Sequence, residues 1–460
     1  MNVGASIVRS LEAIGVEHMF GGAGEANAAM LMELKKSTRL KPIIVRNEQA
    51  ASFMACGYSM FSDKLGVCFS TAGPGEFNLF SGLAVALSDS LPVLAISGFV
   101  PAARSGKGAL NEATGLSRTP DSRTMMNATT KKSFIIDQAD KACDIVEEAV
   151  NLAFEGRPGP VHIHVPTDVT RIEVPNFREI TLDVKPVFPD EAGLAAIADT
   201  LASALAGGYD IMAIVGYGAI RSHAESEVRR FVERFQIPFV ATMDGKGVLP
   251  EDHPLSLGGL GTAGDPGAER YFDSAKIVLA MGNSFAQNAC YAFRPDLFDG
   301  KTLIHINIDP HEIGKVYEPA HRLVSDVKPA ITALEKALEA RVGEVASKHI
   351  ESDKHALKDI QYGGPKIHPA QLVREMSRLL PDNAVIMGDA GGHMLWLHCH
   401  LQLTRGQVYQ NPGSFGPMAS MVNGAMGIKC ASPERPVVCG CGDGAYLMAG
   451  FEFLTAVQNR

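Results

Sequence analysis

Short apolar runs of strand length alternate with amphipathic stretches of helix length along most of the chain. In the first block this pattern predicts buried strands at KPIIVRN, GVCFST, PVLAISG and PVHIHVP. It predicts helices at SIVRSLEAIGV, EQAASFMACGYSMF and FNLFSGLAVALSDS. Because strands that alternate with helices pair in parallel and are covered on both faces, the block indicates an α/β fold.

The same alternation continues through two further blocks. A polar, proline-containing segment at 168–190 predicts a linker before the second block. A charged stretch at 331–360 predicts a helix, and QYGGPKIHP at 361–369 predicts a second linker. Within these blocks, helices are predicted at AGLAAIADTLASAL and PAQLVREMSRLL, and strands at IMAIVGYG, IPFVAT, KIVLAMG, TLIHINID, AVIMGD and PVVCGCGDG.

The blocks define three expected domains. A chain of 460 residues has the length of about three ordinary domains. The boundaries fall at residues 1–168, 190–340 and 367–460, and the third block is short for a domain. We therefore expect three Rossmann-like α/β domains with parallel central sheets, of which the third is truncated at its C-terminus.

Composition and charge exclude several classes of protein. Hydrophobic residues make up 46% and charged residues 20%, which is typical of a globular chain and excludes a disordered or collagen-like one. The formal net charge of −9 argues against nucleic-acid binding, since phosphate neutralisation needs a basic surface. No run approaches the roughly 18 apolar residues of a membrane helix, and the first residues lack the pattern of a secretory signal. Eight scattered cysteines indicate reduced thiols, so we expect a cytoplasmic protein that binds neither nucleic acid nor membrane.

A Gly-Pro-Gly turn, formed by Gly73, Pro74 and Gly75, stands between a predicted strand and a predicted helix. Glycine lets a ligand approach the backbone closely, and amides at a helix N-terminus favour an anion. The turn is therefore a candidate binding loop. Its other interpretation is a tight connection between strand and helix.

Glu48 stands at the start of the predicted helix EQAASFMACGYSMF. Its neighbours on this helix are small or apolar, so we expect its carboxylate to face a poorly solvated cleft. A carboxyl group in such a place can have a raised pKa and exchange a proton with a ligand nitrogen. Its other interpretation is an acidic residue that the helix dipole favours in the first turn.

Gly442, Asp443 and Gly444 follow the predicted strand PVVCGC. Parallel sheets present their binding loops at the carboxyl ends of strands. An aspartate in such a turn suits Mg²⁺, which takes few carboxylates and completes its coordination with phosphate oxygens and water. The tripeptide is also common in ordinary turns.

Together and in this order, the motifs resemble the acetolactate synthase-like family of thiamine diphosphate enzymes, which includes pyruvate oxidase and benzoylformate decarboxylase. The family fold has a pyrimidine-binding, a central and a diphosphate-binding α/β domain, which the resemblance assigns to residues 1–168, 190–340 and 367–460. The matching phrases are GASIVRSLEAIGVEHMFGGAGE, RNEQAASFMACGYS, STAGPGEFN, GRPGPVHIHVPTDV, IPFVATMDGKGVLPEDHPLSLGG, IHINIDPHEIGK, GDAGGHMLW, GSFGPMASMVNGAMG and GDGAYLM.

The resemblance implies roles for individual residues. Glu48 matches the glutamate that hydrogen-bonds the cofactor's aminopyrimidine ring, and Asp443 matches the Mg²⁺ ligand. Met418 matches the apolar wedge that bends the cofactor, and Asn111 and Glu112 match substrate-facing positions. The other positions implied to bind the cofactor are Gly73, Pro74, Gly75, Gly391, His393, Gly416, Gly442, Gly444 and Ala445.

The sequence also departs from the family pattern. The phrase MGNSFAQNA stands where FAD-dependent acetolactate synthases have an arginine-bearing stretch, so the implied cofactors are thiamine diphosphate and Mg²⁺ without FAD. The asparagine that is the family's second Mg²⁺ ligand and the C-terminal segment that covers the active site have no counterpart in this sequence.

The resemblance implies an enzyme that decarboxylates a 2-keto acid and ligates the resulting enamine to a second carbonyl compound. A non-oxidative decarboxylase, in which a proton captures the enamine, is an alternative. A catalytically inactive homologue with a regulatory or structural role is another. In this family, pyrimidine- and diphosphate-binding domains of different subunits face each other, which implies a homodimer or homotetramer with active sites at the subunit interface.

Overall fold

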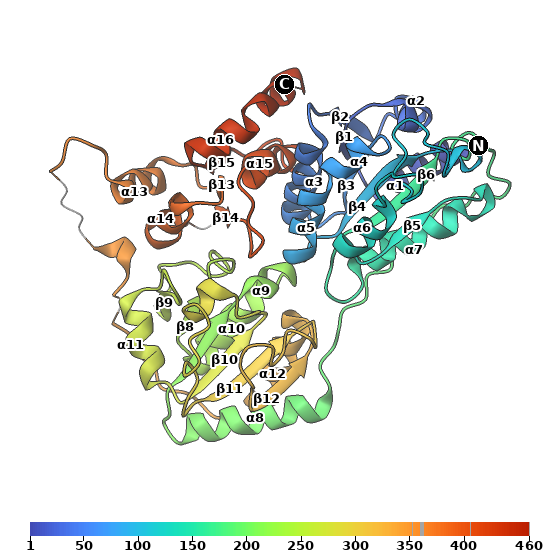
Figure 1. Ribbon diagram of the computed structural model, residues 1–460. Coiled ribbons are helices and arrows are strands. Elements are labelled where there is room, and N and C mark those ends of the chain that lie inside the picture. The colour runs from blue at the N-terminus through green and yellow to red at the C-terminus, as the bar shows by residue number, and fades with distance from the viewer. Residues whose placement is uncertain (352, 359–362, 405, 460) are drawn as a thin grey trace. The chain divides into compact units, whose positions relative to one another are not determined.

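The computed structural model describes residues 1–351, 353–358, 363–404 and 406–459 (Figure 1). The chain separates into two compact units, one formed by Met1–Lys185 with Pro412–Arg460 and the other by Pro186–Asn411. Strands in both units pair in parallel, as the alternation of strands and helices predicted. In the described ranges, no helix combines the length and the apolar character that crossing a membrane requires.

A six-stranded parallel sheet, in the order β2-β1-β3-β4-β6-β5, forms the centre of the first unit. Strands β3 and β6 are buried at every position, since helices cover the sheet. The strands are β1 (His18–Gly21), β2 (Lys41–Ile44), β3 (Gly66–Ser70), β4 (Val93–Phe99), β5 (Ser133–Ile135) and β6 (Val161–Pro166). The helices are α1 (Val3–Ala13), α2 (Ala28–Leu34), α3 (Glu48–Ser62), α4 (Pro74–Asn78), α5 (Phe80–Ser88), α6 (Ser122–Thr129) and α7 (Ala142–Phe154).

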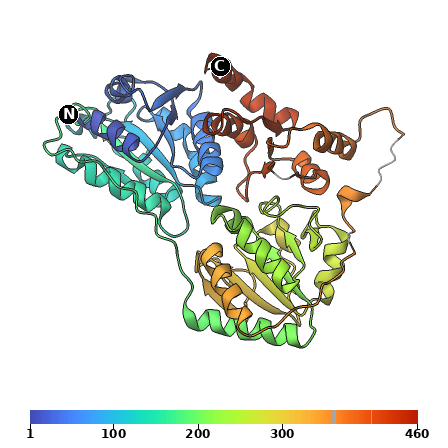
Figure 2. The same ribbon diagram turned by 180° about the vertical axis from the view of Figure 1, so that it is seen from behind.

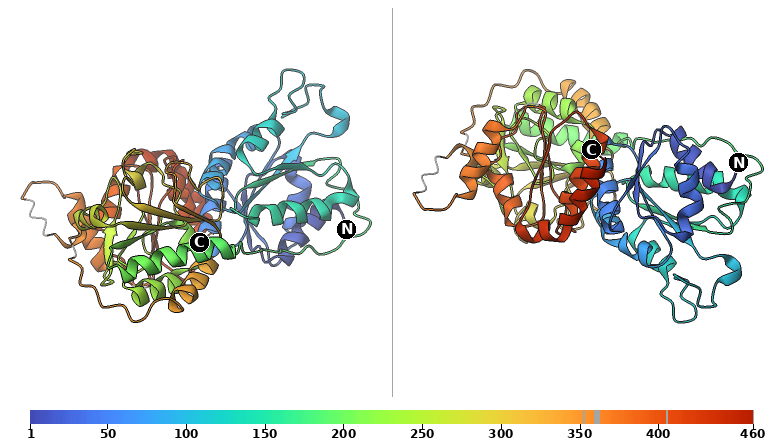
Figure 3. Two further views of the ribbon diagram at one scale, coloured as in Figure 1. Left: turned by 90° about the horizontal axis from the view of Figure 1, so that it is seen from below. Right: turned by 90° about the horizontal axis from the view of Figure 1, so that it is seen from above.

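The last residues of the chain also belong to the first unit. Figure 3 shows their helices, in red, beside the blue helices of the N-terminal residues. Helix α15 packs along α3 so closely that a Cβ atom on Gly57 would overlap the carbonyl oxygen of Gly424. The elements of this segment are α15 (Ser420–Ala431), β15 (Val437–Gly440), α16 (Asp443–Ala449) and α17 (Phe453–Asn459).

The second unit contains another six-stranded parallel sheet, in the order β12-β11-β10-β7-β8-β9. The long helix α8 (Glu191–Ala206), light green in Figure 2, packs beside α12 (Val327–Glu339). The strands are β7 (Ile211–Val215), β8 (Phe239–Ala241), β9 (Ser256–Gly259), β10 (Ile277–Met281), β11 (Thr302–Asn307) and β12 (His321–Val324). The shorter helices are α9 (Tyr217–Arg221), α10 (Glu225–Phe235) and α11 (Pro266–Ser274).

A third, smaller parallel sheet includes β13 (Val385–Gly388) and β14 (Val408–Gln410), which pair in parallel. Helices α13 (Pro369–Leu379) and α14 (Gly392–His400) pack on each other beside these strands. The chain is therefore an α/β protein with three parallel sheets, as predicted.

The helix predicted over 331–360 is largely wrong. Helix α12 ends at Glu339, residues 343–351 have no regular structure, and one 3₁₀ turn follows at His355–Leu357. Gly343 disfavours continuation of the helix. Val345 and Ile350 instead pack against the core from an extended segment, so tertiary packing decides the conformation here. Residues 359 and 360 lie outside the described ranges.

The structure describes the whole of the first predicted linker but only part of the second. The segment 168–190 contains turns and one antiparallel bridge, from Glu173 to Asn2, but no helix or strand. The segment 361–369 begins with two residues outside the described ranges and ends at the start of α13.

Candidate active site

Glu48 is the first residue of α3, which begins there because Asn47 caps the helix. The side-chain oxygen of Asn47 accepts a hydrogen bond of 2.8 Å from the backbone N–H of Gln49. The Glu48 side chain is partly exposed, and its Oε2 accepts a hydrogen bond of 2.9 Å from the side-chain amide of Asn78. The carboxylate is therefore held in one orientation and stays accessible to a ligand.

Loops from three neighbouring strands converge on this carboxylate. Glu48 follows β2, Gly22 follows β1, and Gly75 follows β3, which are adjacent strands of the sheet. A Cβ atom on Gly22 would overlap Oε1 of Glu48, and one on Gly75 would lie 3.0 Å from the same oxygen. The absence of side chains at both positions therefore lets the backbone approach the carboxylate. The site lies at the carboxyl ends of parallel strands, where α/β proteins bind ligands.

The Gly-Pro-Gly turn contacts the segment that carries Asn111. Gly73 precedes α4 with a φ of 57°, in the left-handed region that favours glycine. A Cβ atom there would lie 2.6 Å from the backbone carbonyl oxygen of Asn111. Pro74 is the first residue of α4, where its missing N–H costs no helical hydrogen bond. The structure thus brings Gly73 and Asn111 together.

Glu112 is almost completely buried, and its carboxylate organises the loop around it. It accepts hydrogen bonds from the backbone amides of Gly106, Gly108 and Ala109, and one of 2.6 Å from the Thr114 hydroxyl. The Thr114 hydroxyl, the Gly106 amide and then the other two amides lower the pKa of Glu112 to about 2. The carboxylate is therefore ionised and engaged with its own loop.

The turn around Asp443 begins helix α16. Asp443 is exposed, and its Oδ1 accepts a hydrogen bond of 2.9 Å from the amide of Gly444. The methyl group of Met418 lies against this turn, since a Cβ atom on Gly444 would stand 2.7 Å from it. Gly416, with a φ of 43°, precedes this methionine, while Gly442 caps α16 and Ala445 is buried behind the turn. The structure thus brings Met418 to the turn of Asp443 and Gly444, with Gly416, Gly442 and Ala445 beside them along the chain.

Gly391 and His393 belong to the second unit, where they follow β13 at the start of α14. A Cβ atom on Gly391 would lie 2.6 Å from Cε1 of His393, so the ring covers the glycine backbone. The Nε2 atom of His393 is buried and has no hydrogen-bond partner within the described part of the chain. This nitrogen is available to a ligand oxygen.

Asn78 and Glu452 support Glu48, although sequence reasoning did not select them. The Glu452 carboxylate is buried and accepts hydrogen bonds of 3.1 and 3.3 Å from the backbone N–H of Arg46, two residues before Glu48. Asn78 had a signal in the sequence, because it ends the phrase GPGEFN that begins with the Gly-Pro-Gly turn. Glu452 had none, since its contact spans 406 residues.

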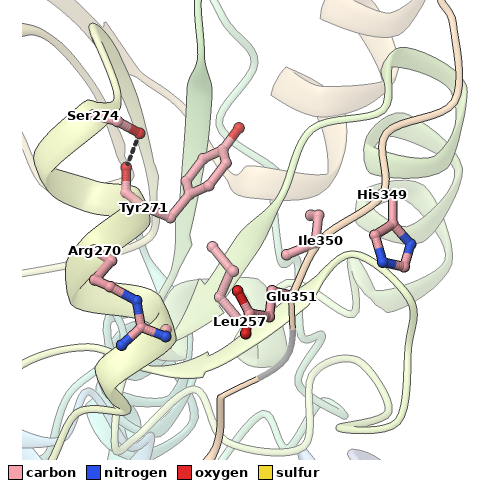
Figure 4. Close-up of a pocket in the computed structure, with 8 residues that line it drawn as sticks. Leu257, Arg270, Tyr271, Ser274, His349, Ile350 and Glu351 are labelled. Carbon is pink, nitrogen blue, oxygen red and sulfur yellow. Dashed lines mark hydrogen bonds between the residues drawn. The ribbon is translucent and has the colours of Figure 1, made fainter.

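A separate cavity of about 250 Å³ opens in the second unit beside α11 (Figure 4). Arg270 and Tyr271 line it from this helix, and His349 and Glu351 line it from the extended segment that replaces the predicted helix. None of the residues predicted to bind the cofactor is among those that line it in the described ranges. The cavity is therefore distinct from the candidate site.

Three family models match the chain. Residues 1–117 match the thiamine pyrophosphate enzyme N-terminal TPP binding domain, and residues 198–334 match the central domain of the same enzymes. Residues 389–460 match the C-terminal TPP binding domain. The matches follow one another in the order that the resemblance implied.

Curated relatives match nearly the whole chain. The probable acetolactate synthase large subunit of Methanocaldococcus jannaschii is 32% identical over 98% of this chain and 77% of its own length. The chloroplastic acetolactate synthase of Arabidopsis thaliana is 31% identical over 98% of the chain and 68% of its own length. The acetolactate synthase isozyme 2 large subunit of Escherichia coli is 30% identical over all of the chain and 81% of its own length.

The chain belongs to the thiamine pyrophosphate enzymes and, within them, is acetolactate synthase-like. It is a thiamine diphosphate-dependent enzyme. The similarity to its relatives does not establish which reaction it catalyses.

Proposed function

We propose that the protein decarboxylates a 2-keto acid and ligates the remaining fragment to a second carbonyl compound. The observation that carries the proposal is the Glu48 carboxylate, held by Asn78 at the meeting point of three strand ends. The relatives over nearly the whole chain are acetolactate synthases, which favours ligation over simple decarboxylation.

The residues of the first unit fit the cofactor. Gly22 and Gly75 leave the Glu48 carboxylate uncovered on the side where a Cβ atom would otherwise stand. Bound thiamine diphosphate supplies a carbon nucleophile that adds to the keto carbon and accepts the electron pair when CO₂ leaves. Glu48 would hold and exchange a proton with the pyrimidine ring, and Asn78 would keep its carboxylate in position. Gly73, Pro74 and Gly75 would border the same ring.

Other residues would hold the opposite end of the cofactor. Asp443 would bind Mg²⁺, since its carboxylate is exposed and carries no positive partner among its described contacts. Gly442, Gly444, Ala445 and Gly416 would line the diphosphate, and Met418 would press against the cofactor from beside Gly444. Gly391 and His393 would contact phosphate oxygens. Asn111 would face the substrate, with Glu112 shaping the loop that presents it.

We further propose that two copies of the chain complete each active site, with Glu48 from one and Asp443 from the other. In this proposal the pyrimidine-binding, central and diphosphate-binding domains comprise residues 1–168, 190–340 and 367–460. The proposal is supported by an apolar surface on α16, α17 and the 3₁₀ turn between them (Gly450–Glu452), which is exposed in the single chain. Its residues include Leu447, Met448, Phe451, Leu454 and Val457. Burying such a surface favours association.

The reaction is tested by calorimetric titration with thiamine diphosphate and Mg²⁺, followed by product analysis with a panel of 2-keto acids. Saturable binding that EDTA abolishes and a branched hydroxy-keto acid product support ligation. Release of CO₂ with an aldehyde as the only product supports the decarboxylase. Binding without turnover of any 2-keto acid contradicts the proposal and favours the inactive homologue. The absorption spectrum of the purified protein tests the expected absence of FAD, and sedimentation analysis tests the assembly.

A further inference from the structure

Glu76, His162 and His164 form a buried cluster in the first unit, and Glu76 directly follows the candidate cofactor residue Gly75 on α4. All three side chains are 0% exposed. The Nε2 atom of His164 lies 2.6 Å from Oε1 of Glu76, and Nε2 of His162 lies 3.8 Å from the same oxygen. Each side chain offers one ligand atom, and these three atoms lie within 4.8 Å of one another.

The sequence places these groups together through two elements. His162 and His164 alternate with apolar residues on β6, so both point to the same face of the sheet. Glu76 lies on α4, immediately after the Gly-Pro-Gly turn, and is directed towards that face. In the sequence, the phrase PVHIHVP points to this cluster, because two histidines at this spacing are unusual in a strand that is buried on both sides.

Two buried polar atoms of the cluster lack a hydrogen-bond partner among the described residues. Within the described ranges, Oε2 of Glu76 and Nδ1 of His164 are buried without a hydrogen-bond partner. A buried carboxylate oxygen that lacks a partner costs free energy, and a buried charge costs more. The unpartnered Oε2 of Glu76, on the carboxylate that faces both histidines, indicates that the cluster has a further binding partner.

We infer that Glu76, His162 and His164 bind a divalent transition-metal ion of the zinc type. Two imidazoles and one carboxylate are a ligand set that zinc and related first-row ions prefer, and that Mg²⁺ does not. Zinc binds such donors at about 2.0–2.2 Å, so its ligands lie between about 3 and 4 Å apart. Oε1 of Glu76 lies 2.6 and 3.8 Å from the two histidine Nε2 atoms, which is close to this spacing.

The surroundings of His162 suit a metal ligand. Its Nδ1 lies 2.9 Å from the hydroxyl of Ser133, which would fix the ring while Nε2 faces the ion. The hydroxyl of Ser97, 3.1 Å from Nε2, would then turn towards Ser70, which is 3.0 Å away.

The ion would join α4 to β6. Glu76 on α4 shares this short helix with Gly75 and Asn78, both of which contact Glu48. A metal bound to Glu76 would therefore fix the helix that holds the Glu48 carboxylate. Because the cluster is 0% exposed, the ion would enter during folding and exchange slowly afterwards.

The test measures metal in the full-length protein purified from cells grown with added zinc and without a histidine tag. We expect about one zinc ion per chain by elemental analysis. Unfolding in a chelator and refolding with Co²⁺ should produce the visible absorption of a four- or five-coordinate cobalt site, and refolding without metal should lower the Tm by several degrees. Protein that contains no zinc and takes up no Co²⁺ overturns the inference and leaves a hydrogen-bonded network.

Variants locate the site. His164→Gln and Glu76→Gln keep side chains of similar size, and each should lower the zinc content at least about tenfold, as the loss of a ligand does. The matched control is His305→Gln, which replaces another histidine with 0% exposure, on β11 of the second unit, and should keep the zinc. If the cluster variants fold and keep their zinc, the site lies elsewhere and the inference is wrong. If the variants do not fold, the Co²⁺ spectrum of the unaltered chain decides whether the cluster binds a metal ion.

Discussion

The side-chain amide of Asn78 donates a hydrogen bond of 2.9 Å to the carboxylate of Glu48, across 30 residues of sequence. Asn78 ends the short helix α4, and Glu48 begins α3. The contact therefore connects the Gly-Pro-Gly turn to the residue proposed to exchange a proton with the cofactor. Because the amide donates to an oxygen of the carboxylate, it fixes the direction of the carboxylate.

Replacing Glu48 by Gln should suppress exchange of the cofactor's thiazolium C2 proton while leaving thiamine diphosphate binding largely intact. Removal of a group that exchanges a proton costs about 10²- to 10⁴-fold in rate. Exchange is measured by NMR of the bound cofactor in D₂O, and binding by calorimetry. The neighbouring variant Gln49→Ala is the control, because this exposed side chain should change neither quantity. Unaltered exchange in Glu48→Gln would show that another group moves the proton.

Replacing Asn78 by Ala should slow the same proton exchange by about tenfold, because an exposed hydrogen bond to a charged group contributes at the lower end of about 1.5–3 kcal/mol. Combining this change with Glu48→Gln should cause little further loss, since Asn78 acts through Glu48. Fully additive losses in the double variant would contradict that positioning role.

Replacing Asp443 by Ala should weaken the binding of Mg²⁺ and thiamine diphosphate together. Loss of a direct anionic ligand should reduce affinity by more than the roughly 10- to 100-fold that outer-shell changes cost. The side chain is exposed, so the Tm without cofactor should stay within about 2 °C of that of the unaltered protein. Titrations with and without Mg²⁺ check both affinities, and Asp183→Ala provides an exposed carboxylate control. Equal affinities before and after the change would remove Asp443 from the proposed metal site.

Replacing Met418 by Ala should slow cofactor-dependent turnover without destabilising the protein. Met418 is 40% exposed and touches the turn at Gly444, so its loss should change the free energy of unfolding by no more than about 0.5 kcal/mol. Met32→Ala removes a more exposed methionine, on α2 and outside the proposed association surface, and should leave turnover unchanged. Normal turnover in Met418→Ala would mean that this side chain does not press against the cofactor.

Replacing Gly427 by Ala should destabilise the packing of α15 on α3. A Cβ atom at this position would overlap the backbone carbonyl oxygen of Met54, which cannot move aside as a flexible side chain can. Overpacking of this kind costs about 1–3 kcal/mol. Urea unfolding measures the change, and Gly343→Ala is the control, because no atom lies within 4 Å of its Cβ position. A Gly427→Ala protein as stable as the original would show that the two helices can separate at no cost.

The stabilising effect of Glu112 should depend on pH. Its pKa is lowered from 4.5 to about 2 in the folded protein, so the unfolded chain takes up the proton first on acidification. The stability that its carboxylate contributes is therefore fully present above about pH 4.5 and is lost as the pH falls towards 2. The difference in unfolding free energy between the unaltered protein and Glu112→Gln should shrink as the pH is lowered from 6 to 3.5. A constant difference across that range would mean that the carboxylate charge does not hold the loop.

Much of the fold was predictable from local patterns. Strand β3 coincides with the apolar run GVCFST. Helix α3 begins at Glu48 because Asn47 caps the helix and the residues after Glu48 favour helical structure. Such signals act over a few residues and do not depend on distant parts of the chain. The extended segment at 343–351 was not predictable in this way, because its charged residues suit a helix while packing of Val345 and Ile350 on the core favours an extended chain.

The sequence alone determined the family, the α/β class and the identity of the polar residues at strand ends, because hydrophobic periodicity and short motifs are local properties. Only the tertiary structure decided which partners those residues have. Glu452 holds the backbone of Arg46, Asn78 holds Glu48, and Glu76 meets His164 across 88 residues. These contacts join elements whose separation along the chain carries no information about their distance in space, because sheet order and helix packing set that distance.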